Sequence, residues 1–471
     1  MAFASRASVK WGFPGLGMLF AVWINDRLCR AMLVDRPRFF DTGWFMALVY
    51  RSGGELRNPD VADSVRSFHG VHVSGLLVLA SKLSEYVRLG RGEWFSLFSA
   101  LPFGLLAGVV WFAVGSPRSW REAYALVSVQ IFASLFGFSV LFAEFPHFEF
   151  YEGVGLAFLA VCLSRERHRL ALLAGVLVSL VREDGALHAM LFVLTHCAIQ
   201  HADVRSRVLR LYLLHIVVLV VFLVGCLAFK SHFPGPSLAR GLYLGDPPFA
   251  HWSLRWMGRR MVGVVTGGTH VIFFALGVIG LVWRMRRVES RLVSSRLFAC
   301  VLASVPWLLA NIFAADDTKC ELGLYLSFPL VGSMLGVVAY ARHLGFGTAC
   351  AALAALIGST SIGLELSHVG AHARNAKWLF GSVASIPELD ELEQSLGSRL
   401  NGCLVDSFAA SWVPNRTHRK DEMNGADLAQ APCLVFNTRY TSLSDHDLDA
   451  AGLKHCAELA GRIYKVCGRE P

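Results

Sequence analysis

The chain has 471 residues, of which 54% are hydrophobic and only 17% are charged. Its mean hydropathy is +0.49, whereas soluble domains carry about 25% charged residues. These values exclude a disordered protein, a fibrous repeat, a coiled coil and an ordinary soluble enzyme. They leave an α-helical polytopic membrane protein.

Apolar segments along the chain predict about 11 membrane crossings, since a helix needs about 20 apolar residues to cross a bilayer. The predicted spans are 11–24, 94–114, 123–142, 153–163, two short helices within 170–199, 211–229, 269–283, 297–313, 322–341 and 346–364. With the N-terminus in the cytoplasm, the short inside loops are basic and the short outside loops are acidic. This agreement requires a break in the 170–199 segment at Arg182–Gly185.

Three longer segments then face outward: a large first loop at 26–93, a second loop at 230–268 and a polar tail. We therefore expect a transmembrane domain over 1–366 and a small extracytoplasmic α/β domain over 367–471. In the tail, 402–408 and 433–437 have the pattern of short strands, and 387–400 and 445–465 that of helices.

Four of the 11 cysteines fall in the tail, namely Cys403, Cys433, Cys456 and Cys467. An oxidising compartment favours disulfides, and four cysteines allow three connectivities. Free buried thiols are the alternative, and the sequence leaves both open.

The net charge of +9 comes from 44 Lys and Arg against 35 Asp and Glu. Because no basic run is interleaved with aromatic residues and no nucleic-acid motif occurs, we expect no nucleic-acid partner. Basic cytoplasmic loops account for the charge.

The first outward loop carries a candidate site, because ionisable groups at a membrane edge are costly. Asp41 stands among aromatic residues, and apolar surroundings raise the pKa of a carboxyl group, which suits a general base. His69 and His72 are three residues apart and would share one face if this stretch is helical. The alternatives are an aspartate that caps an interfacial helix and histidines at the headgroups.

A second candidate lies at 144–152, where acids alternate with aromatic residues. His147, Glu149 and Tyr151 there suit a sugar, a phosphate's counter-cation or a divalent metal, and no metal ligand is assigned. An ordinary acidic outside turn is the alternative.

A third candidate is Arg182, Glu183 and Asp184, three charges between two short apolar helices, of which the acids Glu183 and Asp184 are candidate catalytic residues. The alternative is an ion pair that locks a kink. In the second outward loop, Arg255 and Arg259 share one helical face and suit a lipid phosphate, with plain headgroup anchoring as the alternative.

Several segments together resemble a known class of membrane proteins. They are Phe40–Gly43, Phe68–Ser74, Phe148–Glu152, Val181–Leu187, Leu324–Pro329 with its Tyr325, and Asp406–Arg416. The layout resembles the GT-C class of polytopic glycosyltransferases, and more narrowly a bacterial family of predicted membrane proteins grouped with that class. The resemblance implies that Asp41 is the base and that His72, Glu149, Glu183 and Asp184 line the pocket.

The sequence therefore predicts an inverting membrane glycosyltransferase of the bacterial inner membrane. The expected donor is a polyprenyl-phosphate-linked hexose or pentose, and the expected acceptor is an envelope glycan, lipid or protein. A transporter or flippase of a lipid-linked or small anionic substrate is one alternative, and a non-catalytic partner subunit is another.

Overall fold

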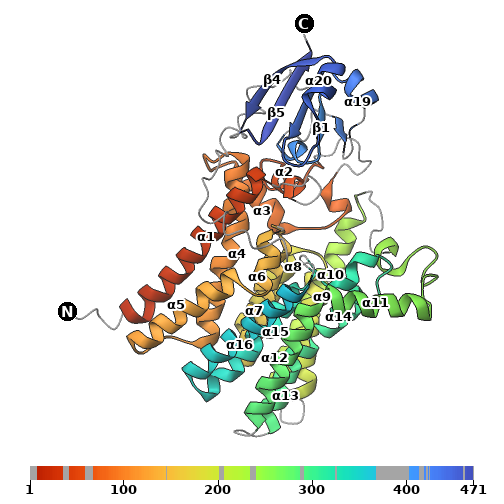
Figure 1. Ribbon diagram of the computed structural model, residues 1–471. Coiled ribbons are helices and arrows are strands. Elements are labelled where there is room, and N and C mark those ends of the chain that lie inside the picture. The colour runs from red at the N-terminus through yellow and green to blue at the C-terminus, as the bar shows by residue number, and fades with distance from the viewer. Residues whose placement is uncertain are drawn as a thin grey trace. The chain divides into compact units, whose positions relative to one another are not determined.

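The computed structural model describes residues 8–35, 42–58, 67–144, 146–200, 206–233, 240–286, 291–323, 326–367, 402–412, 418–420, 423, 425–459 and 462–469. The chain divides into two compact units, shown as ribbons in Figure 1. The first unit comprises Met1–Asn25, His69–Leu76 and Ala100–Arg374. The second comprises Asp26–Phe68, Leu77–Ser99 and Asn375–Pro471.

The first unit is helical. Its helices are α5 (Trp120–Leu135), α6 (Phe138–Glu144), α7 (Glu149–Ser164), α8 (His168–Val181), α9 (Gly185–Gln200), α10 (Ser206–Lys230), α11 (Leu254–Thr266), α12 (Thr269–Arg286), α13 (Arg291–Leu302), α14 (Val305–Ile312), α15 (Phe328–Ala341) and α16 (Phe346–Leu366). Short helical turns η4 (Arg240–Leu244) and η5 (Asp317–Glu321) lie in the connections. Helices α1 (Phe13–Asp35) and α4 (Arg91–Val114) run from one unit into the other.

Helices α7 and α15 form the centre of the first unit, and every residue of α15 is buried. Glycines allow the two backbones to approach closely, as small residues do between membrane helices. A Cβ atom at Gly332 would lie 3.2 Å from Leu156, and one at Gly336 would lie 3.2 Å from the Cβ of Ala160. This packing fixes the first turn of α7, which carries Glu149 and Glu152.

The predicted break within 170–199 is confirmed, since α8 ends at Val181 and α9 begins at Gly185. Gly185 leaves room for the chain to return against α8, because a Cβ atom there would lie 3.0 Å from the carbonyl carbon of Val178. The three charged residues of the sequence pattern occupy this break.

Among the described residues, α4, Val208–Lys230 of α10 and α16 are long and apolar enough to cross a membrane. The bent pair α11–α12 is a fourth if it counts as one span. The predicted total of about 11 crossings stays a prediction. Two segments predicted as single spans, 123–142 and 297–313, each contain two helices. The first is divided at Gly137, whose positive φ of 63° interrupts the helix.

The tail in the second unit contains a five-stranded sheet in the order β2-β1-β3-β5-β4. The strands are β1 (Leu404–Asp406), β2 (His418–Lys420), β3 (Cys433–Asn437), β4 (Leu453–Leu459) and β5 (Tyr464–Arg469), with helices α19 (Gly425–Gln430) and α20 (Asp445–Ala450). Strand β1 runs parallel to β2 and β3, and β5 runs antiparallel to β3 and β4. The two predicted strands and the α/β character of the tail are confirmed.

The predicted helix at 445–465 is wrong beyond Ala450. Gly452 has a φ of 74°, which ends the helix, and Leu453–Leu459 forms a strand paired with β5. A helical pattern could not reveal that cross-strand pairing would override it. The other predicted tail helix, 387–400, lies outside the described residues.

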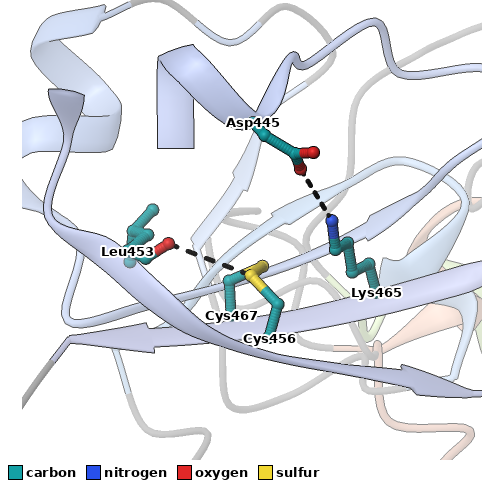
Figure 2. Close-up of a disulfide and its surroundings, with 5 residues drawn as sticks. All are labelled: Asp445, Leu453, Cys456, Lys465 and Cys467. Carbon is teal, nitrogen blue, oxygen red and sulfur yellow. Dashed lines mark hydrogen bonds and ion pairs between the residues drawn. A yellow bond between two sulfur atoms is a disulfide. The ribbon is translucent and has the colours of Figure 1, made fainter. Parts of the chain in front are cut away.

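Disulfides settle the cysteine connectivity that the sequence left open. Cys403 pairs with Cys433, and Cys456 pairs with Cys467. Figure 2 shows the second disulfide between neighbouring strands β4 and β5, together with the ion pair of Asp445 and Lys465 at 3.0 Å. Both bridges staple the sheet of the tail.

The second unit also joins the first loop to the tail. Helix α2 (Trp44–Leu48) contacts the short turn η9 (Ala409–Ser411). A Cβ atom at Gly43 would lie 2.7 Å from the Cα of Ser411, so the glycine supplies space for this contact. Arg91 of α4 donates a hydrogen bond to the carbonyl of Trp412 at 3.2 Å.

The two disulfides should differ in their contribution to stability. They close loops of 30 and 11 residues, and the chain-entropy relation assigns these loops about 3.6 and about 2.8 kcal/mol. We expect the Cys403→Ser/Cys433→Ser variant to unfold more easily than Cys456→Ser/Cys467→Ser. Thermal unfolding of the full chain, monitored by proteolysis of the tail, measures the difference. Equal losses of stability in the two variants would contradict the loop-length argument.

Candidate functional site

A buried arginine organises the break between α8 and α9. Arg182 donates a hydrogen bond from Nη1 to Oε1 of Glu149 at 2.7 Å, and its Nε and Nη2 atoms bind the two oxygens of Asp184. Burial alone would raise the pKa of Asp184, but the charge and hydrogen bonds of Arg182 hold it below its ordinary value. The expected cluster of Arg182, Asp184 and Glu149 is therefore a single ion network.

Glu183 turns to other partners. It accepts hydrogen bonds from the backbone N–H of Val73 at 2.9 Å and from Nζ of Lys230 at 2.8 Å, and Nδ1 of His72 lies 3.1 Å away. Burial would raise the pKa of Glu183, but His72 and Lys230 outweigh it and lower the pKa to about 2. These contacts bring the first-loop segment, the break and the end of α10 together.

The Arg182 ion network and the residues around Glu183 border a cavity of about 940 Å³ within the first unit. Its charged lining consists of Arg182, Glu183, Asp184, Lys230 and Lys319, and His72 and His188 add imidazoles. The other walls are mainly apolar side chains: Leu187, Leu191, Leu223, Leu227, Leu242, Leu244, Phe233, Phe249, Trp252, Pro306, Trp307, Phe313 and Leu326. The cavity therefore combines a group of charged side chains with a mainly apolar lining.

The other expected site residues are placed as follows. His147 contacts Glu149, and Tyr151 lies half-buried in the first turn of α7. The His69 ring is buried against Phe229 and Phe233, with ring centres 5.2 Å apart in both cases.

Of the expected residues, the cavity lining contains His72, Arg182, Glu183 and Asp184, and it does not contain His69, His147, Glu149 or Tyr151. Asp41 and Tyr325 lie outside the described residues, so their roles stay predictions. Arg255 and Arg259 lie exposed on α11 and are not among the residues that line the cavity.

Sequence reasoning missed several cavity residues. Lys230 ends a long apolar helix, where a lone cation is typical of a membrane boundary. Lys319 follows two aspartates and has the pattern of a solvated turn. His188 and Trp307 stand in apolar helices, where single polar or aromatic residues are most often part of the core. Only the fold reveals that these residues line the same cavity.

The cavity residue His188 lies close to a buried carboxyl group. Glu152 is completely buried, and neither of its carboxyl oxygens has a hydrogen-bond partner among the described residues. Nε2 of His188 lies 4.0 Å from Glu152 and 3.9 Å from Asp184. The rings of Trp307 and Phe328 hold the imidazole edge-on. Buried polar groups without partners are rare and costly, which marks this pair as part of the site.

A divalent metal was one expected cofactor. Within the described ranges, no three or more His, Cys, Asp or Glu side chains are arranged to hold a metal ion, and Glu149 is already engaged by Arg182. The residues that the structure describes do not fit a metal.

Comparison with known proteins shows the fold. No protein family and no curated protein matches the chain by sequence. Two solved structures of ArnT from Cupriavidus metallidurans have similar folds. One, bound to undecaprenyl phosphate, has 11% identity and a TM-score of 0.51, and the match covers 96% of this chain and 98% of that one. The other, in the apo state, has 12% identity, a TM-score of 0.50 and coverages of 98% and 99%. The GT-C-like fold expected from the sequence is confirmed, and the chain is a membrane protein.

Removal of Arg182 should destabilise the protein strongly, because Glu149 and Asp184 would keep buried charges without their cation. We expect Arg182→Met to lower the free energy of unfolding by about 3–5 kcal/mol, measured by thermal unfolding in detergent. The control is Arg121→Met at an exposed arginine, which should change little. Equal losses in both variants would show that the buried ion network does not depend on the charge of Arg182.

Lys230 should control the acid stability of the break. Because the folded state lowers the pKa of Glu183 to about 2 from 4.5, its stabilising effect is present above about pH 4.5 and is lost as the pH falls towards 2. Lys230→Met removes one cause of the lowered pKa, so the contribution of Glu183 should be smaller and its loss should be complete at a higher pH than in the wild type. Unfolding midpoints across the acid range test this shift. Lys82→Met, at an exposed Lys82–Glu85 pair, should keep the wild-type profile.

Proposed function

We propose that this chain is an inverting membrane glycosyltransferase that transfers a hexose or pentose from a polyprenyl-phosphate donor to an envelope acceptor. The observation that carries the proposal is the cavity, whose lining combines charged groups with many apolar side chains. A lipid phosphate has the same two parts, an anionic head and a hydrocarbon chain. The fold shared with ArnT, solved with undecaprenyl phosphate, supports the same substrate class.

The cations of the cavity suit the leaving group. Transfer breaks the bond between the anomeric carbon and a phosphate oxygen, so the departing lipid phosphate gains a negative charge. Arg182, Lys230 and Lys319 line the cavity, and positive groups that face a developing charge stabilise the transition state. The apolar walls exclude water and strengthen this interaction.

The acceptor side of the reaction is assigned from the sequence. In the proposed step, Asp41 takes the proton of the acceptor hydroxyl while its oxygen attacks the anomeric carbon from the face opposite the phosphate. The new bond inverts the anomeric configuration, and the phosphate leaves on the lipid. Attack by a neutral hydroxyl is slow, and a positioned base typically contributes about 10²–10⁴-fold.

Glu183 and Asp184 were expected to be catalytic acids. Both are held by cations, Glu183 by Lys230 and Asp184 by Arg182. This geometry favours a role in which the two carboxylates orient the cations towards the phosphate. Proton transfer by either residue stays a prediction.

The proposed orientation has the N-terminus in the cytoplasm and the tail outside the bacterial inner membrane. The two disulfides of the tail support this orientation, because disulfides persist in oxidising compartments. The basic short loops on the opposite side support it independently.

The reaction can be tested with the full chain in nanodiscs that contain polyprenyl-phosphate sugars. We expect release of polyprenyl phosphate together with a glycosylated acceptor, and we expect Asp41→Asn to abolish both. Glu85→Gln removes an exposed acid of the same predicted loop and should retain activity. Envelope glycans and lipid-linked sugars, compared in cells with and without the gene, identify the sugar and the acceptor.

Three outcomes would contradict the proposal. Full activity of Asp41→Asn would remove this residue from the mechanism. Movement of the lipid-linked sugar across the bilayer without any glycan product would favour a flippase. A stable co-purified partner, with indifference to every acid-to-amide change, would favour a non-catalytic subunit.

A further inference from the structure

Helix α11 has a row of apolar side chains that the protein leaves uncovered. Leu254, Met257, Met261 and Val265 follow one another at helical spacing along one face. Their exposed fractions are 88%, 40%, 57% and 59%. Soluble surfaces rarely expose such a continuous apolar row, so this face has a partner of its own.

The opposite face of α11 is fixed to the protein. Trp256 and Arg260 are buried there, and the Arg260 guanidinium donates hydrogen bonds to the carbonyls of Ala314 and Asp316. It also stacks over the Trp256 ring, 4.9 Å from the ring centre. The helix is therefore held in one rotation about its axis, with the apolar row outward.

The orientation of α11 follows from the next helix. Helices α11 and α12 meet at an angle of 70°, and Figure 1 shows α11 leaving the bundle to the side. Exposed Leu276, Ile279 and Trp283 give α12 a surface for lipid tails. If α12 runs across the bilayer, α11 lies close to the membrane plane. Its 13 residues span only about 20 Å, too short to cross a core of about 30 Å.

Two cations flank the apolar row. Arg255 and Arg259 are one helical turn apart and both exposed, and neither forms a salt bridge within the part of the chain that the structure describes. Just before the helix, exposed Phe249 and Trp252 pack against each other, with ring centres 5.2 Å apart. Aromatic rings and arginines gather at the headgroup level of membranes.

We propose that α11 is an interfacial helix that binds anionic phospholipid, with Arg255 and Arg259 on the headgroup phosphates and the apolar row among the acyl chains. A weakly hydrophobic helix with one apolar and one basic face has this behaviour. Neither the two arginines nor the apolar row lines the cavity, although the preceding Phe249 and Trp252 do. The test measures lipid binding, so the proposal stands whether or not the chain transfers sugar.

The proposal can be tested with phosphatidylglycerol that carries a photoreactive diazirine in its acyl chain. Added to the full chain in detergent, this lipid should form adducts at Met257 and Met261, located by mass spectrometry. Each arginine near a charged surface contributes about 1 kcal/mol, so Arg255→Gln/Arg259→Gln should raise the concentration for half-maximal labelling roughly thirtyfold. Arg118→Gln/Arg121→Gln removes the same charge from two exposed residues at the start of α5 and should leave labelling of α11 unchanged.

Three results would overturn the proposal. The first is labelling of α11 that survives the Arg255→Gln/Arg259→Gln change. The second is equal labelling by photoreactive phosphatidylcholine, which would show an apolar contact without headgroup recognition. The third is displacement of the lipid by glycerol 3-phosphate, which would indicate a site for a free phosphate. Thermal unfolding of both double variants should match the wild type, because all four arginines are exposed.

Discussion

The arrangement of the first unit depends on one buried guanidinium. Arg182 joins Glu149, at the start of α7, to Asp184, two residues further along its own break. A buried charge is tolerated only with opposite charges and hydrogen bonds around it, so the two carboxylates and the arginine need one another. Their ion network holds the break against α7, the helix that packs most closely on α15. The charged residues of the cavity are positioned by this network.

The extended backbone at the break explains how neighbouring residues of one short segment reach partners on opposite sides. Arg182 has φ and ψ near −155° and 155°, and successive side chains of an extended chain point to opposite sides. Arg182 therefore reaches Glu149, while Glu183 reaches Val73 and Lys230. A continuous helix through these residues would turn them by only 100° each and could not hold both sets of partners.

The sequence predicted those features of the structure that local patterns and membrane energetics determine. Charges between two short apolar helices indicated the break, and the polar tail indicated short strands, because these signals are contained in short segments. Lys230 and His188 were missed because a single polar residue in an apolar helix has no local signature of its neighbours. The strand at Leu453–Leu459 was missed because β5 and a disulfide, not its own pattern, determine its conformation. Asp41 and Tyr325 remain sequence-based predictions, since the structure does not describe them.

The contact of α2 with η9, next to Gly43, has a consequence for biosynthesis. The second unit combines Asp26–Phe68 and Leu77–Ser99 with Asn375–Pro471, so its two ends are separated by most of the polypeptide. A ribosome completes the early part long before the late part, and domains generally fold as units. The early segments must therefore wait, with the α2 surface uncovered, until the final hundred or so residues have been synthesised. Chaperones that recognise nascent chains have their longest opportunity to act on this surface.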